Sequence, residues 1–91
     1  MKTHYLDRVS SIADAKSALG SLLCENASTW LLRAADGDVI AYFNVVESDI
    51  ELIGPAVTAD VSGRHYNEDA AVIGVLKELQ KKIGGVLGYA P

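Results

Sequence analysis

Cysteine and long apolar runs are scarce in this 91-residue sequence, and each scarcity excludes a class of structure. The single Cys24 cannot form a disulfide within the chain. No apolar stretch approaches the roughly 18 residues that a membrane-spanning helix needs. The N-terminal segment MKTHYLDRVSS also lacks the apolar centre of a signal peptide. We therefore expect a reduced, cytoplasmic protein that makes no contact with a membrane.

Basic residues are also in short supply. Eight Lys and Arg stand against twelve Asp and Glu, which gives a net charge of −4. Binding to a nucleic-acid backbone needs a basic stripe, and the basic residues here are dispersed apart from three lysines near the C-terminus. Spacing typical of metal ligands is missing as well, because His65 and Glu68 form one pair while His4 and Cys24 belong to other elements. We expect no nucleic acid, no metal and no cofactor.

Apolar residues make up 49 % of the sequence and charged residues 22 %, which is typical of a folded chain. We expect residues 1–91 to form a single domain. Two segments have apolar residues at helical spacing, from Ser11 to Asn26 and from Asn67 to Gly85, with Ser11 and Asn67 as N-caps. The apolar stripe of the second helix consists of Val72, Val75, Leu76, Leu79 and Ile83.

A β-hairpin is the clearest local signal. In TWLLRAADGDVIAYFNVVE, two β-rich runs flank an Asp-Gly pair at 36–37, which suits a two-residue type I′ turn. This turn would pair Arg33 with Ile40 and Trp30 with Phe43. A three-residue loop with a bulge at the glycine is the alternative. We favour the two-residue turn because it keeps an aspartate out of the apolar face.

The remaining strands have weaker local signals. Residues 57–62 alternate between apolar and polar and predict a half-buried strand. Residues 3–7 alternate in a way that allows an edge strand, whereas IELI at 50–53 and VLGYAP at 86–91 are ambiguous. The predicted order is (β)αβββα(β), an α+β fold in which two helices cover one face of an antiparallel sheet of three to five strands. The strand order, and whether residues 1–9 and 86–91 form strands, stay open.

The second face of the hairpin is more apolar than we expect of a surface in contact with water. Four of its six residues are apolar or aromatic, whereas a solvated sheet face is normally polar. Because the two helices are expected on the opposite face, we expect a second copy of the chain, or another protein, to cover this one. Scattered apolar residues that need no partner are the alternative. The predicted interface consists of Leu31, Arg33, Ile40, Tyr42 and Val46.

A second candidate site is DVSGRHYNED, residues 60–69, at the corner between the last central strand and the second helix. Turn and capping chemistry explain most of this stretch and leave only His65 and Tyr66 without a local role. His65 is a group suited to proton transfer, and Arg64 to holding a small anionic ligand. The candidate ligand-binding residues are Asp60, Ser62, Arg64, His65 and Tyr66.

The sequence thus predicts a small, non-catalytic binding or protein-interaction domain that forms a homodimer. Its ligand or partner cannot be identified from these residues. The alternative is a small enzyme or anion-binding protein whose site is the corner at 60–69, where Arg64 binds an anion and His65 moves a proton.

Overall fold

The computed structural model describes residues 2–26, 29–47, 54–63 and 67–90. In chain order the elements are β1 (Lys2–Asp7), α1 (Ile12–Leu22), β2 (Cys24–Asn26), β3 (Thr29–Arg33), β4 (Val39–Val46), β5 (Ala56–Val61), α2 (Asp69–Ile83) and β6 (Val86–Ala90). The predicted α+β order is confirmed, and strands form at both ends of the chain. One element, the three-residue β2, is additional to that order. The ambiguous segment at 50–53 lies outside the described residues.

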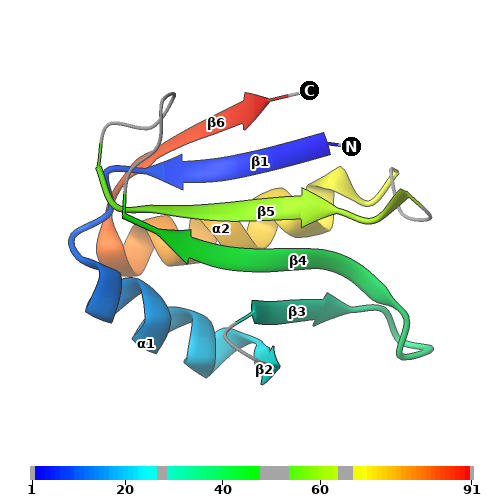
Figure 1. Ribbon diagram of the computed structural model, residues 1–91. Coiled ribbons are helices and arrows are strands. Elements are labelled where there is room, and N and C mark those ends of the chain that lie inside the picture. The colour runs from blue at the N-terminus through cyan, green and yellow to red at the C-terminus, as the bar shows by residue number, and fades with distance from the viewer. Residues whose placement is uncertain (1, 27–28, 48–53, 64–66, 91) are drawn as a thin grey trace.

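The strands form one antiparallel sheet in the order β2-β3-β4-β5-β1-β6. Figure 1 shows α1 and α2 on the same side of this sheet, so its other face carries no helix. The N-terminal strand β1 is not at the edge, as its alternation had suggested, but lies between β5 and β6. The first and last strands of the chain, β1 and β6, are therefore neighbours in the sheet.

The first helix begins as predicted. Ser11 is its N-cap, and the Asp14 backbone N–H donates to the Ser11 hydroxyl at 3.1 Å. The helix ends earlier than predicted, at Leu22, because Leu23 is extended and the following residues pair with β3 as β2. Pairing with a neighbouring strand therefore replaces the last turn that the sequence up to Asn26 indicated.

The Ser11 cap gives a first prediction. Ser11→Ala should lower the free energy of unfolding by about 1 kcal/mol, because the Asp14 N–H loses its acceptor at the helix start. Urea denaturation measures this difference. Ser17→Ala, at an exposed position within the same helix, is the matched control and should cost nothing. Equal effects of the two substitutions would show that the cap contributes no stability.

The second helix buries the stripe that its spacing predicted. Val72, Leu76, Leu79 and Ile83 are buried, and Val75 packs against the core from its edge. The predicted Asn67 cap is wrong, since the N-cap is Glu68 and makes no side-chain capping bond. The helix ends where two glycines were expected to end it, with φ of +71° and +108° at residues 84 and 85.

The hairpin turn differs from the prediction near its tip. The Ala34 N–H donates to the Asp38 carbonyl at 2.8 Å, so the loop has three residues rather than two, with Gly37 at φ +90°. Arg33 therefore faces Val39, not Ile40. A β-bulge at Ile40 then absorbs the extra residue and restores the register that the two-residue turn would have given.

This compensation preserves the predicted faces further along the hairpin. Trp30 faces Phe43, as predicted, and both are buried under the helices. The bulge also changes one assignment, because Ile40 joins the core instead of the outer face. The core lies between the sheet and the two helices, and its largest fully buried side chains are Phe43, Leu6, Leu19, Leu76 and Leu79.

Candidate functional site

The helix-free face of the sheet, here called the outer face, is built from cross-strand rows of side chains. The registers place Leu31 beside Tyr42, Tyr42 beside Asp60, and Asp60 beside Thr3. A neighbouring row joins Asn44 to Thr58 and Thr58 to Tyr5. These two rows cross the middle of the sheet, so their side chains define the centre of the outer face.

Polar groups in these rows satisfy one another. The Thr3 hydroxyl donates to Asp60 Oδ1 at 2.7 Å, and the Thr29 hydroxyl donates to Asn44 Oδ1 at 3.0 Å. Both bonds join paired strands, so they hold these side chains against the sheet. The Asp60 carboxylate and the Asn44 amide oxygen therefore have partners within the chain before any other molecule approaches.

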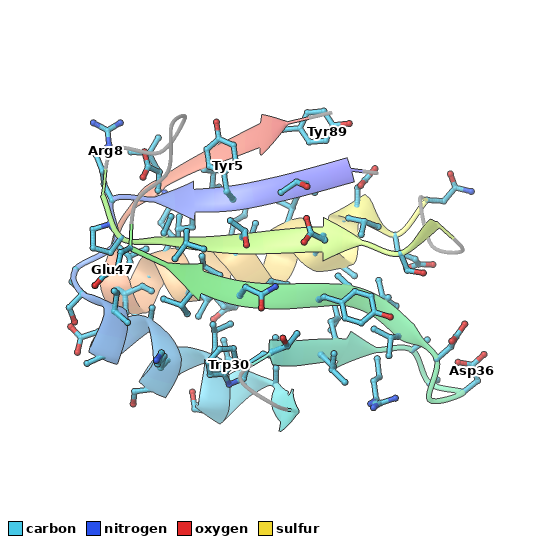
Figure 2. All side chains as sticks on the ribbon, viewed as in Figure 1. Tyr5, Arg8, Trp30, Asp36, Glu47 and Tyr89 are labelled. Atoms are coloured by element: carbon cyan, nitrogen blue, oxygen red, sulfur yellow. The ribbon has the colours of Figure 1, made fainter. Side chains whose placement is uncertain are left out.

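Aromatic and apolar side chains lie beside these polar pairs and at the β6 edge of the face. Tyr42 is 43 % exposed, and Val86, opposite Asp7 at the β6 end of the face, is 51 % exposed. Figure 2 shows Tyr5 rising from β1 toward β6. A side chain at Gly88 would overlap the Tyr5 ring, so this ring lies directly over the β6 backbone. The outer face therefore presents aromatic surface on two of its strands.

The predicted interface residues divide into two groups. Tyr42 and Arg33 are exposed, and Val46 is half-buried. Leu31 is only 7 % exposed, since it lies between paired residues of β2 and β4, and Ile40 is turned into the core by the bulge. The outer face is accordingly more polar along the hairpin than the sequence indicated, and its exposed apolar surface extends to β6 instead.

The predicted corner at 60–69 is described only in part. Asp60 lies on β5 with its carboxylate bonded to Thr3, and Ser62 follows the strand with its N–H donating to the Ile40 carbonyl at 2.8 Å. Arg64, His65 and Tyr66 lie outside the described residues. The two described members thus have structural hydrogen bonds.

A pocket lies on the opposite side of the sheet, where α2 passes β1 and β6. Its volume is about 300 Å³, and it is lined by His4, Ile73, Leu76, Leu87, Gly88 and Tyr89. The His4 imidazole lies beside the Tyr89 ring, with centroids 4.8 Å apart and planes tilted by 38°. His4 Nε2 lies 3.1 Å from Asp69 Oδ1 in the first turn of α2.

Sequence reasoning missed this pocket. Its polar pair joins residues 65 positions apart, and Tyr89 comes from a segment whose structure was ambiguous. One signal was present in THYLD, because the alternation that allows a strand there places His4 on the same face as Leu6. Such a histidine needs a partner when it is buried, and His4 is 7 % exposed.

Within residues 2–26, 29–47, 54–63 and 67–90, no group of three His, Cys, Asp or Glu side chains is placed to hold a metal ion. Neither helix in this part of the chain is long and apolar enough to cross a membrane.

Comparison of the chain with protein-family models, with curated proteins and with solved structures finds no match.

Proposed function

We propose that this protein is a non-catalytic binding domain that works as a homodimer, in which the outer faces of two sheets pack against each other. The observation that carries the proposal is the exposed Tyr42 at the centre of a sheet face that neither helix covers. Tyrosine is enriched at the centre of protein interfaces because its ring buries a large area while its hydroxyl keeps a hydrogen-bonding partner.

The charge distribution of the outer face supports this use. Interface centres are depleted of charged residues. Among the described side chains of the two central rows, Asp60 alone is charged, and Thr3 already donates a hydrogen bond to it. The net charge of −4 per chain is therefore carried mostly elsewhere, so two copies can approach through this face with little repulsion at its centre.

The dimensions of the sheet fit a stable interface. Six strands at a spacing of about 4.8 Å give a face about 25 Å wide, and its four central strands are about 17–26 Å long. With its side chains included, the area of this face is comparable to the roughly 600 Å² that each partner buries in the smallest specific interfaces. Two sheets stacked in this way would lie about 10 Å apart, with Tyr42 of each copy between them.

Tyr42→Glu tests this proposal. We expect light scattering to give twice the 9.7 kDa mass of one chain for the unaltered protein, and the monomer mass for the variant at the same concentration. Because a symmetric dimer contains the tyrosine twice, the dissociation constant should rise by about 100- to 1,000-fold.

Leu22→Glu is the matched control. It introduces the same charge at a side chain that is 39 % exposed, but on α1, which lies on the helix-covered side of the sheet. This variant should remain a dimer. An unaltered protein that stays monomeric up to millimolar concentration would contradict the proposal, as would equal weakening by both substitutions.

The cytoplasmic location also remains a prediction from the sequence. The single cysteine, which cannot form a disulfide within the chain, supports it.

A further inference from the structure

The pocket between α2 and β6 combines an apolar lining with one polar group. Ile73 and Leu76 form its helix side, and Leu87 comes from the strand. Gly88 contributes backbone only, so the strand side of the pocket is flat at that point. A volume of about 300 Å³ is at the lower end of the range for small-molecule sites, which suits a molecule with a single ring.

The hydrogen bond to Asp69 fixes which nitrogen of His4 carries the proton. A carboxylate only accepts hydrogen bonds, so the Nε2–H of His4 donates to Asp69 Oδ1 at 3.1 Å. In the neutral imidazole the other nitrogen, Nδ1, is then an acceptor. The His4–Asp69 pair therefore selects the Nε2–H tautomer of His4. In this tautomer Nδ1 binds a hydrogen-bond donor.

The acceptor nitrogen is available to another molecule. No hydrogen bond joins His4 Nδ1 to any residue in the described part of the chain. His4 Nδ1 is also not fully buried. Among the described residues, the only fully buried side-chain nitrogen or oxygen without a hydrogen-bond partner is Trp30 Nε1. Asp69 is not part of the pocket lining, whereas His4 is. The pocket lining thus includes a histidine whose acceptor nitrogen has no hydrogen-bond partner in the described part of the chain.

We propose that this pocket binds a small, uncharged, single-ring molecule that carries one hydroxyl group, of the phenol class, whose hydroxyl donates to His4 Nδ1. The ring of the bound molecule would pack among Ile73, Leu76 and Leu87. It would also contact the Tyr89 ring, because Tyr89 lines the pocket and is 48 % exposed. An uncharged molecule fits best because the lining is mostly apolar, and a charged group would lose its hydration there.

This site is independent of the proposed dimer. His4 and Leu6 point toward the helices, whereas Tyr5 and Tyr42 belong to the outer face. A failure of one proposal therefore leaves the other standing, and Tyr42→Glu should leave ligand binding in the pocket unchanged.

The test uses two probes that differ in one property. The compound 4-methylphenol can donate a hydrogen bond, and 4-methylanisole has the same ring with a methyl ether that only accepts. We expect 4-methylphenol to shift the backbone amide signals of His4, Ile73 and residues 87–89, with a dissociation constant of about 1 mM for so small a molecule. The anisole should bind about three- to tenfold more weakly, because it leaves Nδ1 unpaired.

Two variants locate the interaction. His4→Phe keeps a ring beside Tyr89 but removes both nitrogens, so the two probes should then bind equally. Ile73→Trp, at a half-buried helix position, should fill the pocket and abolish the shifts by both probes without disturbing the core. If His4→Phe fails to fold, the probe comparison in the unaltered protein and the Ile73→Trp result still decide the question.

The proposal is overturned if neither probe shifts the pocket signals at 20 mM, or if both probes bind the unaltered protein equally. Shifts that persist in Ile73→Trp would equally contradict it, because they would place the bound molecule elsewhere. A preference for 4-methylphenol that survives in a folded His4→Phe protein would show that Nδ1 does not accept the hydrogen bond.

Discussion

Phe43→Ala should cost about 3–5 kcal/mol of unfolding free energy, the largest effect that we expect of a single substitution. Phe43 is fully buried at the middle of β4 and packs in the core under both helices. Its removal exposes a cavity that the paired strands β3 and β5 cannot close, since their register holds the backbone in place. A chain of this length is typically stable by about 5–14 kcal/mol, so the loss is a large fraction of the total stability.

Urea denaturation followed by circular dichroism measures this loss. Leu22→Ala is the control, because it also removes a large apolar side chain but from an exposed position at the end of α1. We expect it to cost less than about 1 kcal/mol. A similar loss in the two variants would show that Phe43 does not lie at the centre of the core.

Gly85→Ala should have the second largest effect, a loss of about 2–5 kcal/mol. Gly85 joins α2 to β6 with φ of +108°, a conformation that is strained for alanine. A Cβ atom there would also lie 2.9 Å from the Asp7 carbonyl oxygen and 2.9 Å from Leu6 Cγ. Leu6 is fully buried, and the Asp7 backbone pairs with β6, so neither can move away without disturbing the sheet.

The adjacent Gly84 separates strain from steric overlap. Gly84→Ala is strained as well, at φ +71°, but a Cβ atom would meet nothing within 4 Å. It should cost only about 1–2 kcal/mol, and the difference between the two variants in the same denaturation experiment measures the overlap. If Gly85→Ala were no worse than Gly84→Ala, the close approach of β1 to the start of β6 would be incorrect.

Elements with strong local signals were predictable from the sequence. The apolar stripe of α2, the Ser11 cap and the alternation of β5 all reflect interactions within a few residues, and the structure confirms each of them. The pairing of Trp30 with Phe43 was also predictable, because burying the apolar side chains of both strands on one face permits only that register.

Features that depend on distant parts of the chain were not predictable. The ends of the chain were ambiguous because β1 and β6 are stabilised by pairing with each other, from Thr3 with Ala90 to Asp7 with Val86, almost the whole length of the sequence apart. The end of α1 was misplaced because the pairing of β2 with β3 outweighs the helical signal there. The bulge at Ile40 arises because the loop and the buried face require registers that differ by one residue.

The candidate sites follow the same division. Tyr42 was identifiable as an outer-face residue from alternation alone, and the structure leaves it exposed. The pocket needs His4 from the first strand, Asp69 from the second helix and Tyr89 from the last strand, and no local pattern joins them. Only the position of β1 between β5 and β6 brings these three side chains together.

Contacts between two copies of the chain test the central claim most directly. In a sample that mixes isotope-labelled and unlabelled chains, nuclear Overhauser effects filtered for pairs between copies report only protons that meet across the interface. We predict such contacts from the Tyr42 ring and the Val86 methyl groups, both on the outer face. Intermolecular contacts confined to α1, α2 or the free edge of β6, or none at all at millimolar concentration, would contradict a homodimer formed through that face.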